Sequence, residues 1–381
     1  MLKTKLRARG YLNKRLLWIP VLSIILVFIL LTVVFFSATP SETPLKWNVQ
    51  ILDSANIGEG SSIALDSSNN PQISYCGFVN DINERCNLKC ARWNGSGWSI
   101  QTVDSFGNNG FYSSIALDSH GYPHISYYTD AYYNGSSGHI KYAAWNGSAW
   151  NIQTIDDNAG DGSSIAVDSA NNPHIIYDGF NNSGLRYAKW AGSNWLVQAV
   201  DSAGFIEGDK CLALDSNSNP RVVYNNDGLK YAKWNGSDWV IQSVLSGGAF
   251  RSSVALDSKD YPHISCTNFW ADGYLNYAHW TGTTWSIQTI DSTNKNGGGN
   301  SIALDSNDNP HMSCSYSANN ILNYAKWSGS AWSIQTVNSS DVWTHTSIAL
   351  DDNNNPHISY CTNPSGGFIR GGLNYATVAI S

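Results

Sequence analysis

Residues 113–127 have the sequence S-S-I-A-L-D-S-H-G-Y-P-H-I-S-Y, and variants of this stretch recur along most of the chain. The S-S-I-A-L-D part ends at seven aspartates: Asp66, Asp118, Asp168, Asp215, Asp257, Asp305 and Asp351. Successive members are 42 to 52 residues apart. Each is followed by a run such as Leu229–Trp234 (L-K-Y-A-K-W) and then by one such as Trp98–Val103 (W-S-I-Q-T-V). Seven internal repeats therefore decide the fold.

Each repeat contains four short runs with the character of β-strands. The runs are rich in β-branched and aromatic residues and are bounded by Gly, Asn, Asp or Pro. The W-N-G-S-x-W connection predicts a hairpin, because Asn-Gly accepts the positive φ values of a tight turn. D-S-x-x-N-P predicts a second turn. Four strands in each of seven repeats of roughly 40–50 residues predict an all-β, seven-bladed β-propeller. A β-solenoid is the alternative, although its repeats are usually shorter.

The order of strands within a blade follows from a resemblance. The run I-A-L-D-S-x-x-N-P-H-I-S-Y resembles the first hairpin of NHL-type propeller repeats, whose first strand lines the central channel. The chain also resembles repeat β-propellers of microbial cell-surface proteins. The resemblance implies that S-I-A-L-D is the innermost strand and W-x-I-Q-T-V the outermost. We then expect the first strand, Trp47–Leu52, to complete the last blade, as in the velcro closure of WD40 propellers.

The N-terminal segment differs from the repeats. Residues 1–15 carry six lysines and arginines and no acid, and residues 16–36 carry no charge. A helix of that length spans about 30 Å, enough to cross a bilayer core. We therefore expect a cytoplasmic basic arm at 1–15, a transmembrane signal anchor at 16–38, a stalk at 39–46 and the propeller at 47–381. This predicts a single-pass cell-membrane protein with an extracytoplasmic propeller. A cleaved signal peptide is the alternative.

The composition excludes several classes of protein. Of the 381 residues, 13% are charged and 12% are aromatic, whereas disordered chains are highly charged and poor in aromatics. A coiled coil would need Glu, Lys and Leu at heptad spacing. The formal net charge is -7, and the chain beyond residue 15 holds 16 basic and 29 acidic residues. This acidic balance argues against nucleic acid as a partner, because such binding requires a basic domain or stripe.

The variable loops are the best candidates for a binding site. The D-S-x-x-x-P and W-x-G-x-x-W turns keep nearly one length in every repeat, whereas the connections on the other face vary and are longest in blades 7, 1 and 2. Function tends to lie on loops held by a rigid scaffold. The candidate ligand-binding residues on this face are Glu59, Glu84, Arg85, Phe111, Tyr112, Trp343, His345 and Arg370. Aromatic rings beside a few charges would suit a sugar face or a peptide. A solvated rim without a ligand is the alternative.

Other patterns are interpreted as scaffold. One repeat position is histidine in five repeats: His124, His174, His263, His311 and His357. We expect these to form hydrogen bonds between blades and to bind no metal. The D-x-N-x-N stretches at Asp305 and Asp351 lack the glycine and distal glutamate of a calcium loop, so they predict capped turns. Cys76, Cys86 and Cys90 cluster, and one disulfide is expected there. No cofactor is expected.

The sequence favours binding over catalysis. It contains no G-x-S-x-G nucleophile elbow, no phosphate-binding glycine motif and none of the S-x-D-x-G-x-T-W boxes of sialidases. A propeller fold alone implies no activity. We expect a membrane-anchored extracellular module that adheres to a glycan or protein through its variable face. A glycosidase-like, glycan-processing enzyme is one alternative, and a structural cell-envelope protein without a small ligand is the other.

Overall fold

The structure consists almost entirely of β-strands. The computed structural model describes residues 44–54, 57–78, 86–105, 109–129, 138–202, 204–247, 249–268, 273–292, 297–316, 319–363 and 371–379. Residues Leu45–Ser381 form one compact unit. Its described elements are strands β1 to β27 and one short 3₁₀ helix, η2 (Phe180–Asn182). The all-β class expected from the sequence is confirmed.

The strands form six hydrogen-bonded sheets, of which five have four strands and one has seven. The first sheet comprises β2 (Ile57–Leu65), β3 (Pro71–Phe78), β4 (Cys86–Trp93) and β5 (Trp98–Asp104). The seven-stranded sheet comprises β6 (Asn109–Leu117), β7 (Pro123–Thr129), β8 (Gly138–Trp145), β9 (Trp150–Val167), β10 (Pro173–Gly179), β11 (Leu185–Trp190) and β12 (Trp195–Asp201).

The other four sheets have four strands each. One comprises β13 (Glu207–Leu214), β14 (Pro220–Asn225), β15 (Leu229–Trp234) and β16 (Trp239–Leu245). The next comprises β17 (Ala249–Leu256), β18 (Pro262–Asn268), β19 (Leu275–Trp280) and β20 (Trp285–Asp291). Another comprises β21 (Gly297–Leu304), β22 (Pro310–Tyr316), β23 (Ile321–Trp327) and β24 (Trp332–Asn338). The last comprises β25 (Val342–Leu350), β26 (Pro356–Thr362), β27 (Leu373–Val378) and β1 (Trp47–Asp53).

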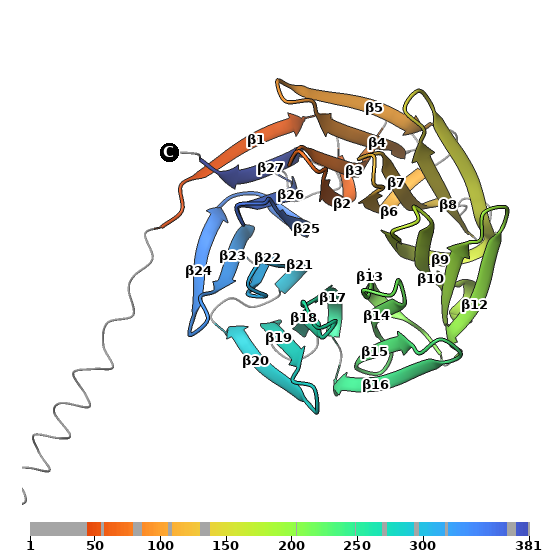
Figure 1. The fold of residues 1–381 in the computed structure, drawn as a ribbon. Helices are drawn as coiled ribbons and strands as arrows, with labels where there is room; N and C mark the ends of the chain where they lie inside the picture. The colour runs from red at the N-terminus through yellow and green to blue at the C-terminus, as the bar shows by residue number, and fades with distance from the viewer. Residues whose placement is uncertain are drawn as a thin grey trace, which may run out of the picture. The chain divides into compact units, whose positions relative to one another are not determined.

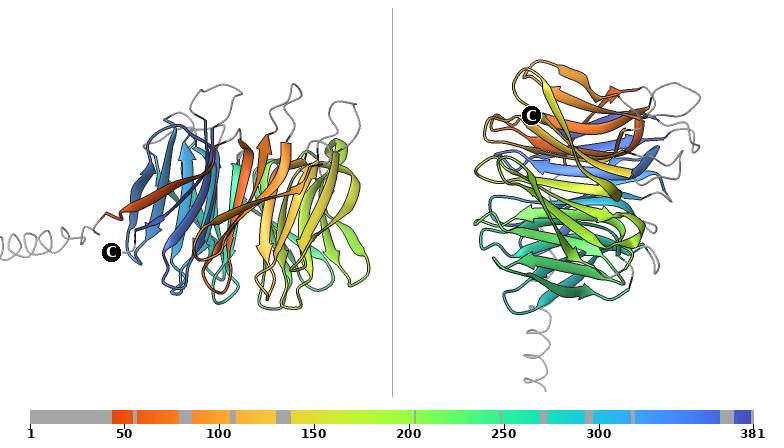
Figure 2. Two further views of the ribbon diagram at one scale, coloured as in Figure 1. Left: turned by 90° about the horizontal axis from the view of Figure 1, so that it is seen from above. Right: turned by 90° about the vertical axis from the view of Figure 1, so that its right-hand side faces the viewer.

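Within each group of four strands the strands follow the predicted order from the centre outward. The S-I-A-L-D strands, such as β2, β17 and β25, lie closest to the common centre, whereas β5 and β20 lie at the periphery (Figure 1). Neighbouring strands are antiparallel, as in the series β17, β18, β19 and β20. Figure 2 shows the strands running between two faces of the unit, with the tight hairpin turns gathered at one of them.

Strand β9 belongs to two groups of four strands. Its residues 150–159 pair with β8, and its residues 159–167 pair with β10. The strand therefore passes without interruption from the outermost position of the group β6–β9 to the innermost position of the group β9–β12. This continuity joins two groups into the seven-stranded sheet.

The first and last strands of the unit pair with each other. In β1, Trp47 lies opposite Val378 of β27, and Ile51 lies opposite Asn374. The N-terminal strand thus becomes the outermost strand of the sheet that β25, β26 and β27 begin. The predicted closure is confirmed.

The paired serines of the S-S-I-A-L-D motif connect neighbouring groups of strands. The second serine accepts a hydrogen bond from the N–H of the aliphatic residue in the next inner strand, as from Ile115 to Ser62 at 3.2 Å and from Leu212 to Ser164 at 3.1 Å. The N–H of Ile63 donates to Ser347 at 3.3 Å, which closes the ring between the last group and the first. Backbone N–H groups at the edge of an inner strand need a hydrogen-bond acceptor. The serine hydroxyl of the neighbouring group supplies that acceptor.

Apolar side chains fill the space between neighbouring groups. In one of the seven buried clusters, Ile176 of β10 packs with Val222 of β14. Burying a side chain of this size stabilises the fold by about 1.5–3 kcal/mol. The hairpin tryptophans extend these clusters outward: the ring of Trp98 meets Tyr375 edge-to-face at 5.2 Å, and its Nε1 donates to Oε1 of Gln50 at 3.2 Å.

The predicted membrane anchor is not supported. No helix in the part of the chain that the structure describes is long and apolar enough to cross a membrane. The expected basic arm (1–15), anchor (16–38) and the stalk up to residue 43 lie outside the described residues. The expected localisation, a single-pass membrane protein with an extracytoplasmic propeller, is therefore corrected. It rested on the basic residues of 1–15 and the charge-free run of 16–36, and such a pattern does not by itself make a membrane-spanning helix.

Candidate functional site

A pocket of about 790 Å³ lies on the face opposite the hairpin turns, which is the face of the variable connections. Its volume is within the range of small-molecule sites, roughly 300–1,000 Å³. Five aromatic residues line it: Phe111, Tyr112, Tyr128, Phe180 and Phe205. Its acidic and amide lining residues are Asp161, Asp178, Asn181 and Asn182. The pocket therefore combines ring faces with acidic and amide groups.

Two of the aromatic rings are exposed. Phe180 in η2 is 39% exposed, and Phe205 in the connection between β12 and β13 is 59% exposed. Large apolar side chains in one pocket are more informative than scattered ones, because such clusters mark binding sites. The two rings belong to neighbouring groups of strands, so the pocket spans a boundary between repeats.

The connection that carries Phe180 is held in one conformation. Asn181 and Asn182 have φ values of 53° and 60°, in the left-handed region that asparagine tolerates better than most residues. Gly184 has φ +83°, and a Cβ there would lie 2.1 Å from the carbonyl oxygen of Asp201, so only glycine fits. Nη1 of Arg186 lies 2.7 Å from Oδ2 of Asp156, and this ion pair fixes the start of β11.

An ion pair with Lys210 holds Asp178, which lines the pocket. Nζ of Lys210 in β13 lies 2.5 Å from Oδ2 of Asp178 in β10 and donates to the carbonyl oxygen of Asp161 at 3.0 Å. Asp178 is 7% exposed, and its Oδ1 has no hydrogen-bond partner among the described residues. Burial raises the pKa of Asp178 to about 6, and Lys210 offsets only part of this rise. The site thus holds a carboxyl group that titrates near neutral pH.

One repeat position carries side chains into the channel beside this pocket. The residue before the S-S pair is glycine in three repeats and a larger residue in four: Gly60, Tyr112, Gly162, Asp209, Arg251, Gly299 and His345. Most of these border a central cavity of about 140 Å³, which is otherwise lined by the paired serines and their equivalents. Tyr112 lines both the cavity and the larger pocket. Departures from the repeat therefore gather in one place.

Tyr112 adopts a backbone conformation that favours glycine. Its φ is 49°, and the equivalent Gly60 and Gly162 have φ values of 84° and 82°. A bulky residue in this region costs about 1–3 kcal/mol. The tyrosine ring lies 5.9 Å from the imidazole of His345, measured between ring centroids. Strain kept at a pocket wall points to function, because packing alone would favour glycine.

The other three side chains at this position contact one another. Nη1 of Arg251 lies 3.2 Å from Oδ2 of Asp209 and also donates to Nε2 of His345. His345 is 8% exposed, and burial together with Arg251 lowers its pKa to about 3. The imidazole is therefore neutral at physiological pH and carries its proton on Nδ1. The cluster joins an arginine, a neutral histidine and a carboxylate at the channel mouth.

The structure brings together part of the predicted site. Phe111 and Tyr112 line the pocket, and His345 faces Tyr112. Trp343 packs instead against the buried cluster that contains Ile63.

The remaining predicted residues are not placed. Glu84, Arg85 and Arg370 lie outside the described residues, and the side chain of Glu59 in β2 is not described. Whether these charges gather over the first and last blades stays a prediction.

Several residues of the pocket were not singled out from the sequence. These are the lining residues Asp161, Asp178, Phe180 and Phe205, together with Lys210, which forms the ion pair with Asp178. The sequence does contain a signal for Lys210. The first residue of the S-S pair is Ser, Thr or Asn in six repeats, whereas the fourth repeat has Lys210 there. The aromatic and acidic residues lie in variable connections, where comparison between repeats offers no reference.

The repeated histidines belong to the scaffold, but their hydrogen bonds run within a blade and not between blades. Oη of Tyr324 in β23 lies 2.6 Å from Nδ1 of His311 in β22, and Nε2 of the same ring lies 3.6 Å from Oδ2 of Asp305. The other four repeated histidines have equivalent tyrosine and aspartate neighbours. These contacts connect the first three strands of the blade.

The D-x-N-x-N stretches form capped turns, as predicted. Oδ1 of Asp305 accepts hydrogen bonds from the N–H groups of Asn307 and Asn309, at 2.9 and 2.8 Å, and its Oδ2 accepts from Nδ2 of Asn309 at 3.1 Å. Asp351 caps its turn in the same way. The carboxylates satisfy local backbone donors.

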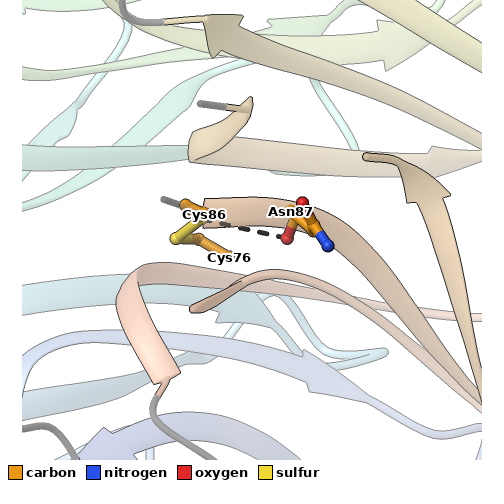
Figure 3. The surroundings of a disulfide bond; sticks show 3 residues. All are labelled: Cys76, Cys86 and Asn87. Carbon is orange, nitrogen blue, oxygen red and sulfur yellow. Dashed lines mark hydrogen bonds between the residues drawn. A yellow bond between two sulfur atoms is a disulfide. The ribbon is translucent and has the colours of Figure 1, made fainter. Parts of the chain in front are cut away.

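The expected disulfide is present. Cys76 in β3 is joined to Cys86 in β4, with 5.6 Å between their Cα atoms (Figure 3). Cys90 is buried and free. The bond crosses the base of the connection that contains Glu84 and Arg85, so it fixes both ends of that connection.

Comparisons with known proteins support the fold. No protein family profile and no curated protein sequence matches the chain. A polysaccharide lyase of family PL25, an ulvan lyase solved with a GlcA–Rha3S ligand, is similar at a TM-score of 0.57 and 13% identity, covering 85% of this chain and 94% of the lyase. The Aleuria aurantia lectin, solved with Fucα1-6GlcNAc, gives a TM-score of 0.52 and 14% identity, covering 76% and 98%.

The NanB sialidase from Streptococcus pneumoniae is also similar, with a TM-score of 0.50 and 14% identity over 90% of this chain and 71% of the sialidase. All these proteins are β-propellers, and at such low identity the likeness shows the fold alone. The chain is therefore an all-β protein with the β-propeller architecture, built from repeated four-stranded antiparallel groups.

Proposed function

We propose that this protein is a seven-bladed β-propeller that binds a glycan in the pocket between β6, β10 and β13. Dividing β9 at Ala159 gives seven groups of four strands, in agreement with the seven repeats. The observation that carries the functional proposal is the pocket itself, which five aromatic side chains line together with acidic and amide groups. Propeller neighbours that are lectins, sialidases and lyases support a glycan as the ligand class.

The chemistry of a sugar suits this lining. A pyranose ring has an apolar C–H face and a polar rim of hydroxyl groups, so it needs flat ring surfaces together with hydrogen-bonding groups. Phe180 and Phe205 offer exposed ring faces. The amides of Asn181 and Asn182 can both donate and accept, and the Asp161 carboxylate accepts from hydroxyl groups.

The charged residues predicted from the sequence belong to the same proposal. Glu59, Glu84, Arg85 and Arg370 would extend the binding surface along the variable face, beside Phe111 and Tyr112. If so, replacing Arg85 and Arg370 together weakens binding of a long glycan more than binding of a short one. Equal affinity for both lengths in that variant would remove these residues from the site.

The test of the main proposal is a glycan-binding screen of the full chain. Phe180→Ala and Phe205→Ala should each weaken binding by about two- to tenfold, because an aromatic contact contributes about 0.5–1.5 kcal/mol. Tyr122→Ala is the matched control, since Tyr122 is 36% exposed but lies in the turn between β6 and β7 on the other face. Unchanged affinity in both phenylalanine variants would show that the glycan does not bind in this pocket.

Glycan processing is the second candidate function. The observation that favours it is the cluster beside the pocket, where strained Tyr112 faces a neutral His345 held by Arg251. Asp178, with its pKa raised to about 6 by burial, has the acidity of a general acid or base at neutral pH. A binder leaves bound oligosaccharides intact. An enzyme releases products, and it loses turnover but keeps binding when Tyr112 is changed to Phe.

A further inference from the structure

The pocket is negatively charged. Among the described residues, Asp161 and Asp178 line it and no Lys, Arg or His side chain does. Lys210 compensates one of these two charges through its ion pair with Asp178, and its own side chain is only 3% exposed. The carboxylate of Asp161 is exposed and has no hydrogen-bond or ion-pair partner among the described side chains. One negative charge is thus left for a ligand to neutralise.

A buried acceptor on Asp178, which lines the pocket, is also unsatisfied. Oδ2 of Asp178 receives the ammonium of Lys210, whereas Oδ1 has no partner among the described residues. A buried polar atom without a hydrogen bond costs about 1–3 kcal/mol, so such atoms in native proteins call for an explanation. Because Lys210 already occupies one oxygen and Asp178 lines the pocket, the missing partner would be a donor on a ligand in that pocket.

We infer that the glycan taken by this pocket carries a free amine, as in a 2-amino-2-deoxy sugar, and that Asp178 and Asp161 hold its ammonium group. The inference deepens the proposed function and depends on it. An ammonium donates up to three hydrogen bonds and supplies one positive charge, which matches one free carboxylate and one free acceptor. Sugars with a carboxylate, such as uronates and sialic acids, would meet like charge in the same place.

The aromatic walls favour the same ligand. A cation within about 6 Å of an aromatic ring face is attracted to it, by about 0.5–1 kcal/mol at exposed sites and more when desolvated. Phe111 and Phe180 line the pocket together with Asp178. A neutral N-acetyl group would lose both the carboxylate and the ring contribution, and its bulk would separate the nitrogen from Asp178. The amine is therefore the group on which the site discriminates.

The experiment compares matched tetrasaccharides by calorimetry on the full chain. The probes are fully deacetylated glucosamine tetramer, fully N-acetylated tetramer and the neutral glucose tetramer of the same linkage. We expect the deacetylated tetramer to bind at least about tenfold more tightly than the other two, corresponding to about 1.4 kcal/mol. The preference should shrink at high salt, because the discriminating interaction is electrostatic.

Two variants locate the amine contact. Asp178→Asn should abolish the preference, and Asp161→Asn should reduce it about threefold while leaving folding intact, because Asp161 is exposed. Asp238→Asn is the control of equal charge change, since Asp238 is exposed in the hairpin between β15 and β16.

Equal affinity for the amine and N-acetyl tetramers would overturn the inference while leaving glycan binding in place. A preference that survives in both Asp178→Asn and Asp161→Asn would also overturn it. Failure of every glycan in the wider screen would instead overturn the proposed function.

Discussion

The ammonium of Lys210 lies 2.5 Å from a carboxylate oxygen of Asp178, although the two residues are 32 positions apart and belong to different repeats. Lys210 stands where the other six repeats have Ser, Thr or Asn. The pair buries a lysine whose side chain is 3% exposed, and the other oxygen of the carboxylate is buried without a hydrogen-bond partner among the described residues. An ion pair of this kind is retained at a stability cost, which is understandable if the free oxygen has a ligand.

Binding of a cationic sugar should depend on pH through Asp178. Burial raises the pKa of this carboxyl to about 6, so the group gains its charge as the pH rises through that value. Lys210, Asp161 and Asp209 are the charged groups that act on it. We expect the affinity for the deacetylated tetramer, whose ammonium groups can donate to Asp178, to increase as the pH rises from about 4.5 to about 6, by up to about tenfold. Titrations across this range would show it, and an equally steep dependence in Asp178→Asn would contradict it.

Removing the cation from the Lys210–Asp178 pair should destabilise the fold. Lys210→Met leaves a buried carboxylate without its counter-ion, and losing one partner of a buried pair costs about 3–5 kcal/mol. The double variant Lys210→Met with Asp178→Asn should lose clearly less, because no unpaired charge remains. Urea unfolding of both single variants and the double variant gives the coupling free energy. Strictly additive losses would mean that the two side chains do not interact.

Changing Tyr112 to glycine should separate stability from function. The residue has φ 49°, where the equivalent positions have Gly60 and Gly162, so Tyr112→Gly relieves about 1 kcal/mol of backbone strain. We expect a higher unfolding midpoint together with weaker glycan binding. Tyr112→Phe, which keeps the strain, is the control and should leave stability unchanged. A less stable glycine variant would show that the ring stabilises the fold more than the conformation strains it.

The repeated parts of the fold were predictable, because each interaction occurs several times in one sequence. Ser62 accepts a hydrogen bond from the N–H of Ile115, and Ser164 accepts one from the N–H of Leu212. The S-S pair therefore recurs wherever one inner strand lies beside the next. The closing strand was predictable for a related reason: Trp47 begins a run of outermost type with no blade before it.

The site was only partly predictable. Phe111 and Tyr112 stood out because they precede a regular motif, whereas Asp178 and Phe205 meet only after two different repeats have folded. No spacing in the sequence connects them. Lys210 could have been found as a charge in a serine position. The anchor at residues 16–38 was inferred from charge and hydropathy, which describe a segment and not its structure.

Removing the closing strand should abolish cooperative unfolding. Without residues 47–53, β27 loses its partner and the ring of Trp47 no longer packs against Tyr324, where the centroids are 5.3 Å apart. We expect the sharp thermal transition of the full chain to broaden and shift well below its normal midpoint. Ile51→Ser is the control: this side chain is 69% exposed, and the backbone pairing with Asn374 remains. A deletion that melts like the full chain would refute the closure.

The buried repeated histidines should make the stability of the fold sensitive to acid. Burial lowers the pKa of His311 to about 4, and it lowers the pKa of His174 as well. In the unfolded chain a histidine titrates near 6.5, so the unfolded state binds more protons below that value. The stability is therefore complete above about pH 6.5 and is lost as the pH falls toward 4, by up to about 3 kcal/mol for His311 alone.

Replacing one of the repeated histidines with glutamine gives a direct test of this pH dependence. The first repeat already has Gln72 at the equivalent position, so His311→Gln is a substitution that the blade accommodates. Urea unfolding at about pH 7 and about pH 5 should show a smaller loss of stability in this variant than in the unchanged chain. His120→Gln is the matched control, because His120 has a side chain that is 66% exposed and should leave the loss unaltered. An identical loss of stability at acid pH in the His311→Gln variant would mean that the lowered pKa of His311 is not its cause.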